Sequence, residues 1–494
     1  MNDQTDSNAA AENWNEAGLR NLFSHSADVQ ILPCKLDDAS DSEILLVYAE
    51  GLCDTVQLAQ TVLPKLERQY LRDRFKDLRA DGYSGSLPLI PVKNESAESL
   101  AEYLFQGDLL LLFAETGRLY KMNICNRPER SPQESNTEIS IKGPKDGFTE
   151  DLVVSVALIR KRIRSTSLNY ETFTVGRRTK TKVGLLYFED ILSPDILHEV
   201  RSRIGNIDVD GLYSINQLEE MLADSKYTVF PMFAVTGRPD YAVSSLLAGR
   251  FILIVDGSPM VLIGPAGLSL LMKSPEDVHF NYTYISFARI IRHISLFLSI
   301  SLPGFWVSLA AFHQDQVPFR MMATISGARL GLPMTAQMEM FILLMLLEIF
   351  REAGVRLPSS IGQTLTVVGG LIIGDASIRA GLVSPSVVVV GAITAVTSVT
   401  LVNQSLSTIV SLVRFCIFGV SAFIGMYGMI LCLILLVAYL SRLHSFGMPY
   451  LAPLSPLNVK DLAVSYLRVP WSRMRTRPGS LKPVDRDHQG ENGE

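Results

Sequence analysis

Hydrophobic and polar residues follow different patterns in the two halves of this chain. In the first half, short apolar runs alternate with charged stretches, and the runs EILLVYAEGL from Glu43 and GDLLLLFAET from Gly107 predict buried strands. Beyond residue 285 the apolar runs are much longer, and Arg414 is the only charged residue between Ala380 and Ser441. The pattern predicts an α/β amino-terminal region followed by a polytopic α-helical membrane domain.

The amino-terminal region is predicted to form two α/β subdomains, residues 1–130 and 138–280. The polar, proline-bearing stretch from Cys125 to Thr137 has the composition of a linker between them. In the first subdomain, residues 55–75 predict a helix between the two buried strands.

The second subdomain begins with apolar residues at helical spacing from Leu152, for which Thr149 is a plausible cap. A strand is expected from Thr181, and a hairpin is expected to turn at Asp256 and Gly257. This alternation of helices and strands indicates an α/β subdomain.

The membrane domain is predicted to cover residues 285–445, with four to six membrane segments, and residues 446–494 form a basic tail. The first span lies within 287–313, where the apolar run is long enough to cross a hydrocarbon core of about 30 Å. The last apolar run, 405–443, would extend about 58 Å as one straight helix. It therefore either projects beyond the membrane or turns near its glycines at 425 and 428.

Charged residues flank a shorter apolar helix that begins near Met338. The helix is too short for an ordinary span and is expected to be interfacial, re-entrant or packed inside the bundle, with its carboxylates facing a partner or water. Opposite charges at helical spacing can neutralise one another, which also describes a surface ion-pair network. The candidate membrane charge network comprises Glu339, Glu348, Arg351, Glu352, Arg356, Asp375 and Arg379.

A polar stripe runs along one face of the helix predicted after residue 402. Its members, the candidate pore-lining residues, are Asn403, Ser407, Ser411 and Arg414. An ionisable residue in an apolar segment is costly and commonly lines a water-filled path. Helix packing by small hydroxyl residues, with Arg414 paired to a carboxylate, explains the stripe equally well.

Composition and motifs exclude several classes of function. The formal net charge of −5 gives no global basic surface for nucleic acid. No catalytic, cofactor-binding or metal-binding motif occurs, so we expect neither an enzyme nor a cofactor. The cysteines Cys34, Cys53 and Cys125 lack CxxC spacing, and we expect reduced, structural thiols in a cytoplasmic domain.

A basic cluster, GRRTKTK, lies in the second subdomain. Its side chains could contact anionic lipid, a partner subunit or a phosphate, although a solvated loop entering a strand is the favoured interpretation. The residues concerned are Arg177, Arg178, Lys180 and Lys182.

Basic residues also predict the topology. Arg289 and Arg292 adjoin the first span, and the tail carries further arginines and lysines. By the positive-inside rule both termini are expected to be cytoplasmic, so the number of full crossings should be even.

From about Ile141 onward the chain resembles the A subunit of the GerA family of spore germinant receptors. The matching segments include GPKDGFTEDL at Gly143, GRRTKTKV at Gly176, LPGFWVSLAAFHQ at Leu302, REAGVRLPSSIGQ at Arg351 and SFGMPYLAPLSP at Ser445. One departure from the family pattern is Asp375, at a position where many relatives are expected to be uncharged.

The resemblance implies a multi-pass subunit of the spore inner membrane that takes part in nutrient-triggered germination. It implies homo-oligomerisation into a channel for monovalent cations, beside a transporter-like B subunit and a lipoprotein C subunit. An accessory stage V sporulation channel that amplifies germination is an alternative role within the same resemblance. A secondary transporter and a scaffold are alternatives from other classes, the former favoured by glycine-broken helices.

Overall fold

The computed structural model describes residues 14–488 except 37–42, 74–86, 93–95, 114–116, 127–137, 139, 226, 357–374 and 471–473. The chain divides into two compact units. The α/β unit contains Met1–Lys226, Val235–Pro265 and Met474–Glu494, and the helical unit contains Tyr227–Ala234 and Ala266–Arg473.

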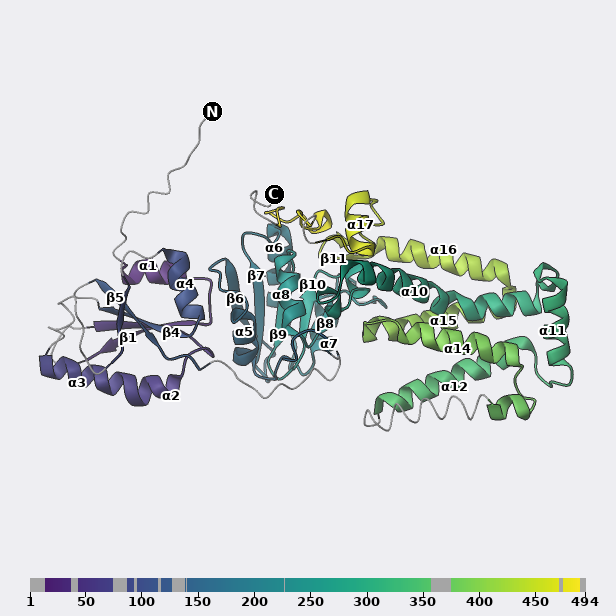
Figure 1. Ribbon diagram of the computed structural model, residues 1–494, viewed down its shortest axis with the longest axis horizontal. Helices are drawn as coiled ribbons and strands as arrows, with labels where there is room; N and C mark the ends of the chain where they lie inside the picture. Colours follow the sequence, from purple (N-terminus) through teal and green to yellow (C-terminus); the bar gives the residue numbers. More distant parts are fainter. Residues whose placement is uncertain are drawn as a thin grey trace, which may run out of the picture. The chain divides into compact units, whose positions relative to one another are not determined.

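The first subdomain of the α/β unit is an antiparallel sheet covered on both faces by helices (Figure 1). The strand order is β1 (Val29–Lys35), β2 (Glu43–Ala49), β4 (Asp108–Phe113), β5 (Arg118–Asn123) and β3 (Ile90–Val92). The helices are α1 (Glu16–Leu22), α2 (Thr55–Gln57), a π-helical turn at Leu58–Val62, α3 (Leu63–Asp73) and α4 (Ala97–Phe105).

Strand β4 shows why both faces of this sheet are covered. Every residue of β4 is buried, because its alternate side chains enter two separate cores. Leu109 and Leu111 pack with the face that holds Leu66 of α3, whereas Leu110 packs with the face that holds Leu104 of α4. The predicted buried strands and the intervening helix are confirmed, and the predicted linker falls largely outside the described residues.

The second subdomain has a five-stranded sheet with helices around it. Its strand order is β6 (Leu168–Val175), β7 (Thr181–Phe188), β9 (Phe251–Val255), β10 (Val261–Gly264) and β8 (Ala234–Thr236). The helices are α5 (Leu152–Arg160), α6 (Pro194–Gly205), α7 (Ile215–Leu222) and α8 (Pro239–Leu247).

Two local predictions in the second subdomain have different outcomes. The hairpin between β9 and β10 is confirmed, and Gly257 adopts the positive φ of 86° that the turn requires. The predicted cap Thr149 is wrong: Asp151 caps α5, because its carboxylate accepts hydrogen bonds from the N–H groups of Val153 and Val154.

The carboxyl-terminal segment 474–488 returns to this subdomain. The Nε of Arg477 donates to the carbonyl of Leu247 at 2.9 Å, and the N–H of Val484 donates to the carbonyl of Ile191 at 3.0 Å. Part of the predicted basic tail is therefore packed against the α/β unit.

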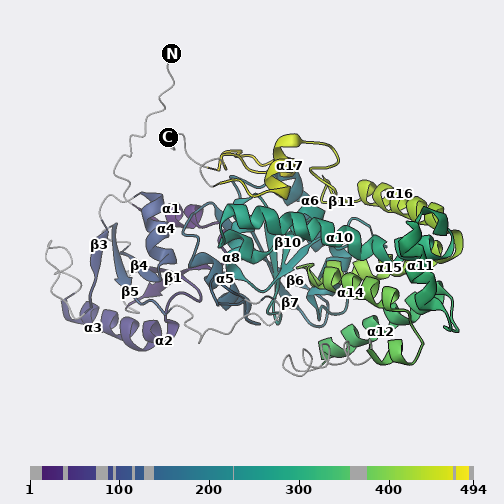
Figure 2. The same cartoon turned by 45° about the vertical axis from the view of Figure 1, so that its right-hand side comes forward.

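The helical unit is built on the long helix α10 (Tyr282–Ala311), which packs against α14, α15 and α16, while α12 packs against α14 (Figure 2). Its elements in chain order are α9 (Leu268–Leu271), the 3₁₀ turn Pro275–Val278, α10, the 3₁₀ turn Gln314–Gln316, α11 (Phe319–Arg329), α12 (Ala336–Arg356), α14 (Pro385–Val399), α15 (Gln404–Ile424), α16 (Met426–Arg442), the two-stranded β11 (His444–Ser445) and β12 (Met448–Pro449), and α17 (Val459–Tyr466).

Among the described residues, α10 and α15 are long and apolar enough to cross a membrane, and α14 and α16 are shorter apolar helices. The long apolar run after residue 404 turns rather than continuing. Gly425 separates α15 from α16 with φ 71° and ψ −147°, a conformation that favours glycine. The turn therefore falls at the predicted glycines.

Candidate functional site

The guanidinium of Arg414 on α15 lies inside the helical unit, with the residue only 5% exposed. It donates to the hydroxyl of Ser398 on α14 at 2.7 Å and to that of Ser411, one turn earlier on α15, at 2.9 Å. Its contact with the carboxylate of Glu348 on α12 is longer, at 3.4 Å. The hydroxyl of Ser299 on α10 lies 3.5 Å away and 2.7 Å from that of Ser398, so four helices meet at one charge.

The physical reason for this arrangement is the cost of burying a charge. An ionised group inside an apolar bundle must be surrounded by hydrogen-bond acceptors or a counter-charge. Serine supplies an acceptor while being small enough for helices to approach closely. We call Ser299, Ser398, Ser411, Arg414 and Glu348 the Arg414 network. The Nε of Arg414 has no hydrogen-bond acceptor within the described residues.

The four predicted pore-lining residues occupy different environments in this chain. Ser411 and Arg414 are buried in the network. Asn403 instead caps α15, where its side-chain oxygen accepts a hydrogen bond from the N–H of Leu406 at 3.0 Å. Ser407, one turn further on, is half-buried.

The predicted membrane charge network separates into several places. Glu348 pairs with Arg351 as well as with Arg414. Asp375 and Arg379 form an exposed ion pair at 2.8 Å. Glu352 is exposed, and the side chain of Arg356 lies outside the described residues.

Glu339 lies in a third place and is fully buried. One carboxylate oxygen accepts a hydrogen bond from the N–H of Ser384 at 2.9 Å, at the start of α14. The other lies 3.4 Å from the Nε of Arg329. Both carboxylates of the apolar segment of α12 thus face partners on other helices. Phe341 and Ile349 on the same helix remain exposed, so the choice among the interfacial, re-entrant and bundle-packed placements stays a prediction.

The basic cluster spans the loop before β7 and the first residues of that strand. Arg177 pairs with Asp208 at 2.6 Å and Arg178 approaches Asp210 at 3.8 Å, all with exposed side chains. Lys180 adopts a positive φ of 46° in the turn. Lys182 lines a polar cavity of about 440 Å³ in the α/β unit, together with Asp28, Glu50, Asp151 and Asp256 among others.

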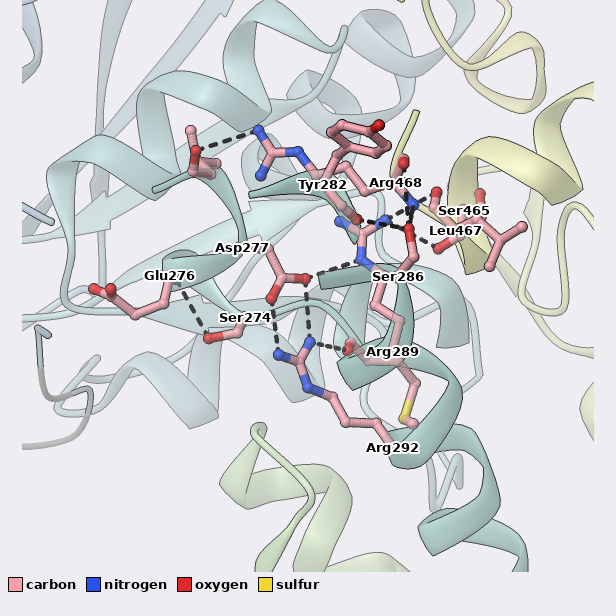
Figure 3. Close-up of polar contacts among 12 residues, drawn as sticks. Ser274, Glu276, Asp277, Tyr282, Ser286, Arg289, Arg292, Ser465, Leu467 and Arg468 are labelled. Carbon is pink, nitrogen blue, oxygen red and sulfur yellow. Dashed lines mark hydrogen bonds and ion pairs between the residues drawn. The ribbon is translucent and has the colours of Figure 1, made fainter. Parts of the chain in front are cut away.

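A second buried charge cluster, missed by the sequence patterns, lies at the amino-terminal end of α10 (Figure 3). The carboxylate of Asp277 accepts hydrogen bonds from the Nε of Arg289 at 3.0 Å and from the two terminal nitrogens of Arg292 at 2.8 and 3.1 Å. Burial alone would raise the pKa of Asp277, but the hydrogen bonds and charges of the two arginines hold it below its usual value.

Hydrogen bonds from the same cluster also connect the end of α17 to α10. Arg289 also donates to the carbonyls of Val464 and Ser465, both at 3.3 Å, in the last turn of α17, where helix carbonyls lack intrahelical partners. The hydroxyl of Ser286 accepts a hydrogen bond from the N–H of Arg468 at 3.0 Å. We call this arrangement, centred on Asp277, the Asp277 junction.

No group of three or more histidine, cysteine, aspartate or glutamate side chains suited to a metal ion occurs in the part of the chain that the structure describes. The buried polar features described above are hydrogen-bonded charge networks between helices. Such networks can hold helices in one arrangement and can have a second arrangement with different partners.

Comparison with known proteins connects these features to a family. Spore germination protein XA of Bacillus anthracis is 42% identical over 483 residues, covering 97% of this chain and 98% of that protein. Spore germination protein KA of Bacillus subtilis is 32% identical over 478 residues, covering 96% and 88%. The crystal structure of the N-terminal domain of the A subunit of the Bacillus megaterium spore germinant receptor GerK3 is 27% identical, with a TM-score of 0.38, and covers 52% of this chain and 96% of that one.

The family described as Bacillus/Clostridium GerA spore germination protein matches residues 17–480. This match covers almost the whole chain, including most of the α/β unit, the Arg414 network and the Asp277 junction. The resemblance predicted from the motifs is confirmed, and the chain belongs to the GerA family of spore germination proteins.

Proposed function

We propose that this chain is the A-type, non-enzymatic subunit of a germinant receptor that conducts monovalent cations when nutrient is sensed. Family membership supports the role in germination. The apolar helices α10, α14, α15 and α16 support placement in a membrane, which for a germination protein is the spore inner membrane.

The observation that carries the conducting role is the buried charge of Arg414. A guanidinium in an apolar bundle is rarely retained for stability alone, since hydrophobic replacements of buried ion pairs are often neutral or stabilising. A fixed positive charge repels cations, so a path beside Arg414 conducts them only when a carboxylate compensates that charge. Glu348 lies at 3.4 Å from Arg414 and is shared with Arg351, which makes it the candidate gating carboxylate.

In the proposed resting state, hydroxyl groups on α10, α14 and α15 surround Arg414 and close the path. In the proposed conducting state, α12 moves so that Glu348 pairs more closely with Arg414 and the serine hydroxyls face water. A ligand signal shifts the balance between the two states only by its differential affinity for them. We propose that the nutrient binds the partner subunits, of transporter-like and lipoprotein type, and that they transmit the signal to this chain.

Copies of this chain are proposed to associate through apolar side chains that remain exposed on its own helices. Val396 and Val399 on α14 and Phe423 on α15 are examples, with exposed fractions of 69%, 83% and 85%. Both termini are proposed to be cytoplasmic, in line with Arg289 and Arg292 at the start of α10.

Cysteine accessibility tests whether the polar face of α15 lines a water-filled path. Ser407→Cys and Ser411→Cys would be introduced into a full chain from which Cys416 and Cys432 have been removed. Val410→Cys is the matched control, because Val410 is 1% exposed and apolar.

With the assembled receptor in vesicles, a charged aqueous thiol reagent should modify the cysteines at 407 and 411 faster after nutrient is added. The control position should stay unmodified. Equal protection of all three positions in both states would overturn the proposed pathway and assign the stripe to helix packing.

A further inference from the structure

We propose that Cys53 and Cys125 are a disulfide-forming pair, which gives the first subdomain an oxidation-sensitive site. Cys53 follows β2 and Cys125 follows β5, and the two residues face each other in an isolated antiparallel β-bridge. Both thiols are free in this structure, and no disulfide joins them.

The backbone hydrogen bonds show which kind of antiparallel pair this is. The N–H of Asp54 donates to the carbonyl of Ile124 at 2.8 Å, and the N–H of Asn126 donates to the carbonyl of Leu52 at 2.9 Å. The bonds therefore flank the two cysteines, which form a non-hydrogen-bonded pair. In such pairs the Cα atoms are about 4.5 Å apart and the side chains point to one face, which falls within the range of about 4.4–6.8 Å found for disulfides.

The side chains converge on one glycine. The Sγ of Cys53 lies 3.3 Å from the carbonyl oxygen of Gly107 and donates to it. The Sγ of Cys125 lies 2.8 Å from the position that a Cβ on Gly107 would occupy. Both sulfur atoms thus lie beside Gly107, and the absence of a side chain there leaves room for them.

The two thiols differ in their exposure to solvent. Cys125 is half-buried, whereas Cys53 is buried, and its burial raises its pKa to about 12. Cys125 is therefore the thiol that a small disulfide such as oxidised glutathione reaches first. Its thiolate attacks one sulfur and releases one glutathione thiolate; Cys53, losing its proton to solvent, then attacks Cys125 and releases the second. Two cysteine thiols are oxidised and one glutathione disulfide is reduced.

The pair lies where a cross-link would restrain both subdomains. Cys125 lies two residues before the stretch 127–137 that leads to the second subdomain. On the other side, the loop before Cys53 touches α5, since a Cβ on Gly51 would lie 2.8 Å from a methyl group of Val153. The disulfide would join the end of the first subdomain, at Cys125, to the loop around Gly51 and Cys53 that contacts the second subdomain.

The test equilibrates the purified full chain, in detergent, with mixtures of oxidised and reduced glutathione. Tryptic digests made without reduction are then analysed by mass spectrometry. Cleavage after lysine and arginine places Cys34, Cys53 and Cys125 in separate peptides, 21–35, 36–65 and 122–130, so each possible disulfide has its own mass.

We expect the 36–65 peptide linked to the 122–130 peptide at the oxidising end of the series, with at least a tenfold excess over any species that contains Cys34. The Cys34→Ser variant should give the same link, and Cys53→Ser should leave glutathione attached to Cys125. Stable glutathione on Cys125 of the native chain without the link to Cys53, or links distributed equally among the three cysteines, would overturn the assignment.

Discussion

Replacing Asp277 with asparagine removes the carboxylate that pairs with both Arg289 and Arg292, while keeping the size of the side chain. The carboxylate accepts hydrogen bonds at 3.0 Å from Arg289 and at 2.8 and 3.1 Å from Arg292. An amide carries no charge and turns two N–H donors toward guanidinium groups that are themselves donors.

Breaking a buried ion pair by removing one partner typically costs about 3–5 kcal/mol. The carbonyls that the arginines also contact, such as that of Met272 at 3.2 Å from Arg292, remain in the variant. We therefore expect Asp277→Asn to lower the free energy of unfolding by about 3 kcal/mol, the lower end of that range. We also expect faster proteolysis around Arg468, because Arg289 would hold the end of α17 less firmly.

The assay is denaturant unfolding of the purified full chain in detergent, followed by timed trypsin digestion. Glu276→Gln is the matched control, because Glu276 lies in the same 3₁₀ turn and its carboxylate points away from the two arginines (Figure 3). A loss of stability in Asp277→Asn no larger than in Glu276→Gln would refute the reasoning.

The stability lost in Asp277→Asn should also depend on pH. Because the arginines hold the pKa of Asp277 below its usual value of 3.8, the ion pairs contribute fully above about pH 3.8 and their contribution is lost as the pH falls through the lower, folded-state pKa. The difference in unfolding free energy between the native chain and Asp277→Asn should therefore shrink on acidification below pH 4. A constant difference down to pH 2 would contradict the assigned pairing.

Further substitutions test packing, first in the helical unit and then in the α/β unit. Gly304→Ala should destabilise the contact of α10 with α15 by about 1–3 kcal/mol, since a Cβ there would lie 2.7 Å from the Ser421 hydroxyl. Adding Ser421→Ala should restore most of the melting temperature, whereas Gly419→Ala, whose Cβ meets nothing within 4 Å, should not lower it. Arg160→Met should cost about 3–5 kcal/mol in denaturant unfolding because it leaves the carboxylate of Asp28 buried without the guanidinium that pairs with it at 2.8 Å; an unchanged midpoint would contradict this.

The sequence predicted those features that local patterns determine. Continuous apolar runs identified the buried strands β2 and β4, and glycines identified the turns at Gly257 and Gly425. Thr149 and Asp151 both precede α5, and both residue types can cap a helix. Only the backbone geometry decides between them, and it selects Asp151 rather than the predicted Thr149.

The polar networks were predictable only in part. Arg414 stood out as a charge in an apolar run, but its partners Ser299 and Ser398 come from other helices, and single serines in apolar segments are common. Likewise, nothing in the local pattern connects Arg289 with the end of α17, some 175 residues later. Such pairings depend on how helices pack, which periodicity does not specify.

The most direct test of the proposed cation conduction is single-channel recording from the full chain in planar bilayers, alone and together with its transporter-like and lipoprotein partner subunits. We expect discrete currents carried by monovalent cations. Arg414→Gln removes the charge that Glu348 pairs with in the proposed conducting state, so it should lower the open probability at least severalfold. Thr408→Ala, at an exposed polar position of the same helix, should not change it. Well-assembled native complexes that stay silent with nutrient, or currents that Arg414→Gln leaves unchanged, would contradict a pathway controlled by Arg414.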